Sequence, residues 1–569
     1  MKKSTAWLIF GLTTLALSVL FFWPLGRVVS GGFWVDGHFT WRYLRGVFSN
    51  PIYVEGLFNS LKIALGTTSF AMVVALPLAW LANQFEFRGK AIFSALVLVP
   101  MILPPFVGAI GFQQIFGAYG MVNTLFGLGA RDWLGGGQYA GVVLLQTLSL
   151  YPILYLNAVA ALANIDPAME EAAANLGCTR LRRFFRITLP LMMPGLFAGG
   201  TLIFIWSFTE LGTPLIMNYT RCAPVQIYDS LKEVGSNPFP YALVSVMLAA
   251  SVGLYAVSRW LFGGKSYAMQ SKASTQSAVR RLTGARALLA ALPFAVVTGL
   301  ALLPHLGVIL TSFAAPGTWY QTVLPGTWSG ANYMAALGHD MTVSSIRNSL
   351  LFSSVAVSID IVAGIAIAFV VVRSNLRLRG VLDALAMIPL AVPGLVMAFG
   401  FMSVSSSLAN WKTMADHDWW LKLVDVRTNP TLFLVLAYSV RRLPYMVRSA
   451  VAGLQQTSVT FEEAAWNLGA SPAVTLRRIT LPLILANLIA GALLTFAFSM
   501  LEVSDSLMLA QQADYMPITK AIFELFQLLG TGKYVAAALG VWAMAFLTAT
   551  LIASSLLLGK KLGAVFRVS

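Results

Sequence analysis

The decisive stretch of this sequence is EEAAANLG at residues 170–177, which recurs as EEAAWNLG at residues 462–469, an offset of 292. The match continues at the same offset, with ITLP at residues 187–190 and again at residues 479–482. Two copies of a long pattern at one spacing indicate an internal duplication.

The composition places both copies in a membrane. Of the 569 residues, 58% are hydrophobic and 11% are charged, and the mean hydropathy is +0.76, which excludes an ordinary soluble domain. Long stretches hold no Asp, Glu, Lys or Arg, and runs of this length predict helices that cross a bilayer. We expect about twelve spans, near residues 6–28, 60–83, 91–116, 138–163, 191–217, 240–262, 287–313, 348–372, 383–407, 430–452, 483–509 and 534–558.

The predicted fold is an all-α polytopic membrane protein built as two parallel six-helix repeats. Because six is an even number, both copies insert in the same orientation and are related by an axis along the membrane normal. We expect a first transmembrane half at residues 1–263, a basic cytoplasmic linker at 264–286, and a second transmembrane half at 287–569.

The formal net charge of +16 predicts orientation and gives no support for a nucleic-acid partner. With the N-terminus inside and alternating spans, the basic residues gather on the cytoplasmic side, where both termini are then expected. They could also contact anionic membrane lipid.

The repeated stretch is expected to form a helix, a corner and a second helix between the fourth and fifth spans of each half. Asp166 and Pro167 supply an N-cap and a proline at the first helical position, and Gly177 can end the helix in a left-handed conformation. Thr179, and Ser471 at the equivalent place, can cap the second helix. Such an element presents an Ala-rich face and an acidic start outside the membrane.

The spacing Glu-Ala-Ala, three residues, Gly, nine residues, Ile-x-Leu-Pro resembles the cytoplasmic signature of bacterial ABC importer permeases, and both copies match it. In that family the segment is a coupling helix that sits in a cleft of the ATPase subunit. The resemblance assigns ATPase coupling to Glu170, Glu171, Ala172, Ala173, Gly177, Glu462, Glu463, Ala464, Ala465 and Gly469. An amphipathic helix lying on the lipid surface is the alternative.

The two-half format, with IPLAVPG at residues 388–394 and RRLPY at residues 441–445, looks most like the ferric-iron permease group. Related permeases for 2-aminoethylphosphonate, thiamine, polyamines or sulfate share much of the pattern. The resemblance implies a multi-pass protein of the bacterial inner membrane. It also implies a periplasmic solute-binding protein received by the outer loops 29–59, 117–137, 218–239 and 314–347.

No cofactor is expected in this chain. GKS at residues 264–266 ends like a phosphate-binding loop, but Arg259 stands where such a loop needs glycine. ATP and magnesium are therefore expected in a separate ATPase subunit, most simply two copies on the two coupling helices. The chain itself is expected to be a transport subunit and no enzyme.

Ionisable residues within predicted spans usually face a cavity or a partner. The candidates for the substrate pathway are Glu210, Glu502, Asp505, Arg441 and Arg442. Glu210 and Glu502 are equivalent, near the outer end of each fifth span, and two facing carboxylates would suit a hard cation such as ferric iron. Alternatively, each Glu caps a neighbouring helix or pairs with an arginine in the packed bundle. The spacing of His and Cys identifies no metal site.

Two other classes of function compete with an ATP-driven permease. A secondary transporter with two six-helix halves would need no duplicated coupling loop, and a membrane enzyme would need a cluster of catalytic residues. An ABC permease should co-purify with an ATPase, whereas a secondary carrier works alone.

Overall fold

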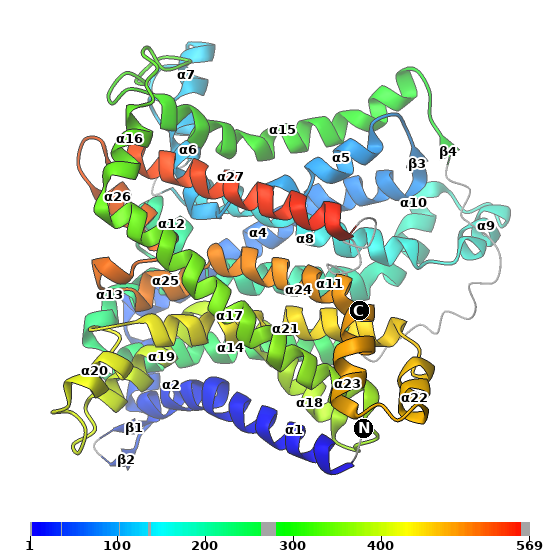
Figure 1. Cartoon of the computed structure of the whole chain (residues 1–569). Helices are drawn as coiled ribbons and strands as arrows, with labels where there is room; N and C mark the ends of the chain where they lie inside the picture. The colour runs from blue at the N-terminus through cyan, green and yellow to red at the C-terminus, as the bar shows by residue number, and fades with distance from the viewer. Residues whose placement is uncertain (1–2, 36, 102, 135–137, 263–279, 559–569) are drawn as a thin grey trace. The chain divides into compact units, whose positions relative to one another are not determined.

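The computed structural model describes residues 3–35, 37–101, 103–134, 138–262 and 280–558 (Figure 1). Most of the expected linker, including the GKS triplet, and the C-terminal residues 559–569 lie outside the described residues. The described chain is almost entirely helical, which confirms the all-α prediction. Its strands are two-residue pairs, β1 (Trp34–Val35) antiparallel to β2 (His38–Phe39) and β3 (Phe85–Glu86) parallel to β4 (Arg280–Arg281).

The described residues fall into two compact units. Unit 1 takes its residues from Met1–Val54, Pro224–Leu248 and Tyr333–Phe566, and unit 2 from Glu55–Ala223 and Ala249–Asn332. Unit 2 contains the core around Tyr151, Leu154 and Phe294, and unit 1 contains the core around Met446 and Val447.

The helices of the first sequence half follow in chain order. They are α1 (Lys3–Leu17), η1 (Ser18–Phe22), α2 (Trp23–Phe33), α3 (Arg42–Ser49), α4 (Pro51–Gln84), α5 (Lys90–Leu96), η2 (Val99–Met101), α6 (Pro105–Phe116), α7 (Met121–Phe126), α8 (Tyr139–Ala163), α9 (Pro167–Asn175), α10 (Arg180–Arg183), η3 (Phe184–Thr188), α11 (Leu189–Phe208), α12 (Gly212–Ile216), α13 (Ala223–Asp229), η4 (Ser230–Glu233) and α14 (Pro238–Phe262).

The helices of the second sequence half repeat much of this order. They are α15 (Ala285–Phe313), α16 (Ala331–Gly338), α17 (Asp340–Arg373), α18 (Arg379–Met387), η5 (Ile388–Leu390), α19 (Gly394–Ala409), α20 (Asp418–Val424), α21 (Thr431–Gln456), α22 (Thr460–Asn467), α23 (Pro472–Thr475), η6 (Leu476–Thr480), α24 (Leu481–Met500), α25 (Ser504–Leu509), η7 (Ala513–Tyr515), α26 (Ile518–Gln527) and α27 (Gly532–Leu558).

Eleven of the twelve expected spans correspond to helices that are long and apolar enough to cross a membrane. In the described residues nine helices meet this condition singly, and two bent pairs raise the number to 11. The pairs Lys90–Met101 with Pro105–Phe126 and Arg379–Leu390 with Gly394–Ala409 bend by 100° and 97°. The span expected at 430–452 lies in α21, 26 residues long, whose arginines at 441, 442 and 448 make it less apolar.

The first span of each sequence half belongs to the unit formed mainly by the other half. Within unit 1, α2 packs against α19, and within unit 2, α15 packs against α6. Glycine permits both close approaches, since a Cβ on Gly400 would lie 2.9 Å from the Pro24 oxygen and one on Gly111 2.6 Å from the Gly307 carbonyl carbon. The two sequence halves therefore do not coincide with the two spatial units. The linker expected at 264–286, as the boundary between the sequence halves, stays a prediction.

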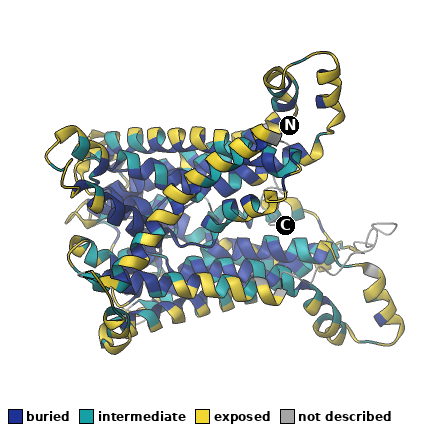
Figure 2. Ribbon diagram, turned by 90° about the horizontal axis from the view of Figure 1, so that it is seen from below, coloured by how far each residue is buried: buried dark blue, intermediate teal, exposed yellow. Residues whose placement is uncertain are grey.

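Burial follows the expected membrane pattern along the long helices. Figure 2 shows buried positions along one side of many helices and exposed positions along the other. Exposed apolar residues are numerous on α1, α4, α15 and α17, such as Leu12, Phe70, Leu289 and Val362. Surfaces of this kind are favourable against lipid chains and costly in water.

Candidate coupling elements and buried charge cluster

The first candidate coupling element is a short helix closed by a glycine corner. α9 begins at Pro167, and the Asp166 side chain accepts a bond from the Ala168 amide at 2.9 Å. Gly177 has a φ of +77°, and the next amide donates to the Ala173 oxygen at 3.0 Å. This Schellman arrangement satisfies carbonyls at the helix end. The predicted cap and corner are both confirmed.

The second candidate coupling element has the same corner and a different start. Gly469 has a φ of +83°, and the following amide donates to the Ala465 oxygen at 2.9 Å. Ser471 accepts from the Val474 amide at 3.4 Å, as predicted, whereas Thr179 stands at the N-cap of α10 without a side-chain bond. The repeat therefore preserves the corner more strictly than the caps.

Both elements expose an apolar and an acidic side chain. Leu176 is 88% exposed and Leu468 is 89% exposed, and each stands directly before its corner glycine. Of the predicted coupling residues, Glu171, Ala172, Gly177, Glu463, Ala464 and Gly469 are exposed, Ala173, Glu462 and Ala465 are buried, and Glu170 is half-buried. Each candidate coupling element therefore presents one exposed leucine at the same place in the repeat.

The first glutamate of each motif points inward and bonds to its own half. Glu170 accepts from the Thr188 hydroxyl at 2.7 Å, and Glu462 accepts from the Thr480 hydroxyl at 3.3 Å. Glu462 also forms a salt bridge with Arg373 at 3.0 Å. The two glutamates of each motif therefore have different environments. Glu170 or Glu462 bonds to residues of its own half, and Glu171 or Glu463 faces outward.

Glu210 lies two residues past the end of α11, in the break before α12. The sequence placed it within the fifth span, and the helix ends earlier because the chain turns at Thr209. Its carboxylate accepts from the Thr213 amide at 2.9 Å and from the Gln146 side chain at 3.5 Å. Both donors are neutral.

Glu502 lies in the equivalent break after α24, and it meets full positive charges. Arg441 and Arg442, both on α21, each form a salt bridge with Glu502, and Arg441 also pairs with Asp505 at 3.0 Å. Glu502 and Asp505 are buried. The pairing of Glu502 with arginines, one of the two predicted alternatives, is therefore the arrangement in the structure.

The buried cluster resembles no metal centre. In the described part of the chain, no group of three or more His, Cys, Asp or Glu side chains is placed to hold a metal ion. Asp360, also buried, accepts from the Ser439 hydroxyl at 2.6 Å. The cluster joins α17, α21 and α25 by polar contacts inside unit 1.

Comparison with known proteins identifies the family. The model described as binding-protein-dependent transport system inner membrane component matches residues 71–263 and 360–563, which together exceed half of the chain. The chain belongs to this family. Each matched segment holds one candidate coupling element, and the double match confirms the predicted duplication.

Known relatives of this permease include iron and molybdenum transport proteins. It is 27% identical over 480 residues to a putative ferric transport system permease protein of Haemophilus influenzae, covering 82% of this chain and 70% of the relative. It is also 27% identical to the ferric transport system permease protein of Actinobacillus pleuropneumoniae, covering 81% of this chain and 64% of the relative. The molybdenum transport system permease protein of Escherichia coli is 29% identical over 222 residues, covering 37% of this chain and 95% of the relative.

Membership of the family settles the class of function. Its members are inner-membrane components of binding-protein-dependent importers, which work with an ATPase and a solute-binding protein. This permease is therefore a transport component and no enzyme, and a secondary transporter is excluded.

The hydrogen bonds of the permease also align the loops that follow each fifth span. The Ser60 hydroxyl accepts from the Ala223 amide at 3.0 Å, and the equivalent Ser349 accepts from the Ile518 amide at 2.7 Å. α13 and α26 begin at these two amides. The start of α13 is therefore the structural equivalent of the start of α26.

Equivalent residues of α13 and α26 touch each other within unit 1. Tyr228 and Phe523 each stand five residues after the aligned amides, and their rings meet edge to face at 6.2 Å. Buried Lys520 lies 3.3 Å from the Tyr228 hydroxyl and pairs with Glu524 at 2.8 Å. Equivalent positions of the two repeats therefore contact each other inside unit 1.

Within unit 1, this contact lies at the end of α24 opposite to α22 and α23. Figure 1 shows α25 and α26 at one end of α24, with α22 and α23 at the other. Sequence reasoning missed the contact because the offset shifts in this loop. Only the hydrogen-bond register reveals that Tyr228 corresponds to Phe523.

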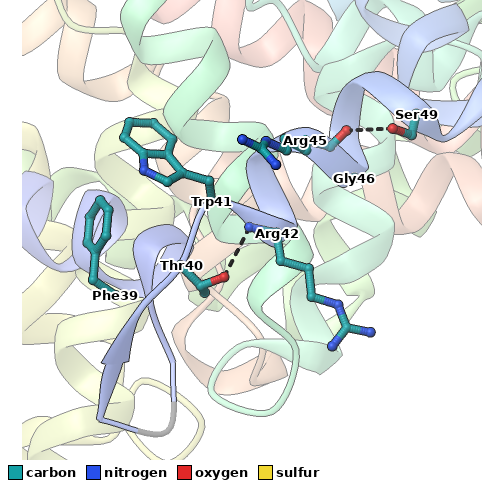
Figure 3. A pocket seen from close by; sticks show the side chains of 7 residues that line it. All are labelled: Phe39, Thr40, Trp41, Arg42, Arg45, Gly46 and Ser49. Carbon is teal, nitrogen blue, oxygen red and sulfur yellow. Dashed lines mark hydrogen bonds between the residues drawn. The ribbon is translucent and has the colours of Figure 1, made fainter.

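The loop between the first and second spans carries an open pocket (Figure 3). The β1–β2 hairpin and α3 line it with Phe39, Thr40, Trp41, Arg42, Arg45, Gly46 and Ser49. The Arg42 amide donates to the Thr40 hydroxyl at 3.1 Å, and the Arg42 guanidinium extends away from the ring of Trp41. By alternation of spans, this basic and aromatic surface lies on the side opposite to the coupling elements.

Proposed function

We propose that this permease forms the translocation pathway for ferric iron in an ATP-driven importer of a bacterial inner membrane. The observation that carries the substrate is the similarity to two ferric transport permeases over more than four fifths of the chain. The similarity to a molybdenum permease spans 37% of the chain, about one of the two repeats, and therefore gives less support to molybdate as the substrate.

Two copies of one ATPase would dock on the two coupling elements, one on each. The matched corners, exposed leucines and outward glutamates support this stoichiometry, because two similar surfaces favour two identical partners. ATP and magnesium would be held by those partners, whose hydrolysis cycle drives alternating access. An amphipathic helix on lipid would not require a left-handed glycine at one place in both repeats.

The coupling elements and both termini would face the cytoplasm. This orientation places the surface with Trp41, Arg42 and Arg45 on the periplasmic side, where the solute-binding protein would dock. Two exposed arginines beside an exposed tryptophan suit an acidic protein surface, because arginine and aromatic residues are enriched at protein interfaces.

Of the pathway candidates, Glu210 is the better contact for a cation. Glu502 and Asp505 are compensated by Arg441 and Arg442, whereas Glu210 is held by neutral donors. A carboxylate without a cationic partner leaves its oxygens available to a hard cation, which prefers oxygen ligands. The arginine pair would instead hold α21 to α25.

The deciding experiment is uptake of labelled ferric iron into proteoliposomes that contain the permease, its ATPase and its binding protein. We expect iron uptake that requires ATP and the binding protein. Molybdate, 2-aminoethylphosphonate, thiamine and a polyamine serve as parallel substrates. Uptake of one of these compounds without uptake of iron would refute ferric iron as the substrate and leave the proposed importer architecture in place.

A further inference from the structure

The end of the second span contacts the coupling element in both halves, through residues at equivalent positions. Gln84 is the last residue of α4, and Arg373 is the last residue of α17, an offset of 289. The Gln84 amide donates to Glu170 at 3.5 Å, and the Arg373 guanidinium donates to Glu462 at 3.0 Å. We call each contact a junction, the first formed by Gln84 and Glu170 and the second by Arg373 and Glu462.

The two junctions differ in chemistry and burial. The second is an ion pair whose side chains are 7% and 5% exposed, and Arg373 also donates to the Thr457 oxygen at 2.8 Å, just before α22. The first is a single long hydrogen bond from a neutral amide to a half-buried carboxylate. The ion pair adds the Coulomb attraction between two full charges, which a neutral amide donor does not supply. Breaking a buried ion pair also leaves an uncompensated charge.

From this difference we infer that Glu170 and Glu462 are positioning residues that fix the coupling helices to the second spans, and that the second junction is the rigid one. α17 packs along α21 and α24. A displacement of α22 by a docked ATPase would therefore pass directly into the helices of unit 1. At the first junction, α9 would keep more freedom relative to α4. This inference rests on the proposed coupling function and is independent of the transported substrate.

The two junctions provide matched controls for each other. Arg373→Gln gives the second junction the chemistry of the first, and Gln84→Arg does the reverse. Glu462→Gln and Glu170→Gln remove the acceptor charge at each junction without changing its size. Exchanging the partners, Arg373→Glu with Glu462→Arg, restores an ion pair in the opposite direction.

The measurements are hydrogen exchange of the α9 and α22 amides and ATP hydrolysis stimulated by the binding protein, both in the assembled complex. We expect Arg373→Gln to speed exchange in α22 by about tenfold or more. The same change should uncouple hydrolysis from the binding protein. Gln84→Arg should slow exchange in α9, and the charge exchange should recover most of the lost coupling.

Three results would overturn the inference. They are equal exchange of α9 and α22 in the parent complex, unchanged exchange and coupling in Arg373→Gln, or a charge-exchanged variant as uncoupled as the single variants. Elution as an assembled complex separates misfolding from a loosened junction. Failure of the parent complex to move iron would overturn the proposed substrate and leave these readouts intact.

Discussion

Replacing Gly177 and Gly469 together by valine is expected to stop transport while the permease still inserts. Their φ angles of +77° and +83° lie in the left-handed region. An added Cβ would meet no atom within 4 Å at either position. The Cβ itself adds no clash, so the expected cost is that of the backbone conformation, about 1–2 kcal/mol at each corner. Over both corners this lowers the population of the intact arrangement by roughly 30-fold to 1,000-fold.

The matched control is the double asparagine variant, Gly177→Asn with Gly469→Asn. Asparagine is close to valine in size and visits the left-handed region more readily. Uptake of labelled iron is measured in proteoliposomes at equal permease content, with elution as an assembled complex as the test of folding. We expect the asparagine variant to retain much of the transport that the valine variant loses.

Two results would refute this reasoning. Normal uptake by the valine variant would show that coupling does not depend on the corners. Equal loss in the asparagine and valine variants would show that side-chain bulk at the partner surface decides the outcome, and that the backbone conformation does not.

Three other variants follow from the buried contacts. Glu502→Gln is expected to cost about 3–5 kcal/mol of stability, because buried Arg442 loses its carboxylate partner while Arg441 keeps only Asp505, and thermal unfolding in detergent would measure it; an unchanged Tm would contradict the pairing. Glu210→Gln should fold like the parent, because the donors to Glu210 are neutral and lose no charged partner. It should weaken iron transport, and an unchanged dependence of uptake on iron concentration would remove Glu210 from the pathway. Tyr228→Cys and Phe523→Cys can be linked by a reducible bifunctional reagent in a background without native cysteines. If the contact between α13 and α26 opens during transport, the link should stop uptake until it is reduced. Continued uptake in the linked protein would show that this contact stays closed during transport.

The elements of this permease were predictable where they depend on local chemistry. Hydropathy located the spans, because a bilayer demands long apolar helices whatever they pack against. Asp166 and Gly177 were assigned correctly because capping involves only neighbours along the chain. The fifth span was predicted to run through Glu210 to residue 217, because apolar residues continue past the last turn of α11 at Phe208.

The grouping of spans into units was beyond the sequence. The first span of each half packs on the third span of the other half, at Gly400 in unit 1 and at Gly111 in unit 2. An isolated glycine in the sequence does not indicate which helix packs against it. Apolar helices in lipid associate through shape, and shape is not written in a hydropathy pattern. The junction residues Gln84 and Arg373 were accessible in principle, because they stand at the same offset of 289 as the matched NSL segments.

Charge distinguishes the two halves of the duplication in a coordinated way. Where the second half places Arg441 and Asp505, the first half has Ser149 and Thr213 at the offset of 292. An arginine buried without its carboxylate would carry a large desolvation cost, so the two charges are expected to be present or absent together. The shared Glu502 and Glu210 show the result, since one is locked by arginines and the other is held by neutral groups.

The same contrast separates the junctions, because Arg373 replaces Gln84 beside a glutamate common to both halves. In the second half, ion pairs therefore fix α17 to the coupling element at one end of the bundle and α21 to α25 at the break after α24. In the first half, hydrogen bonds from neutral donors occupy both places. Since a neutral donor supplies no second full charge to attract the carboxylate, the first half can rearrange at lower cost. Motion during transport should accordingly be larger in α9 and α12 than in α22 and α25.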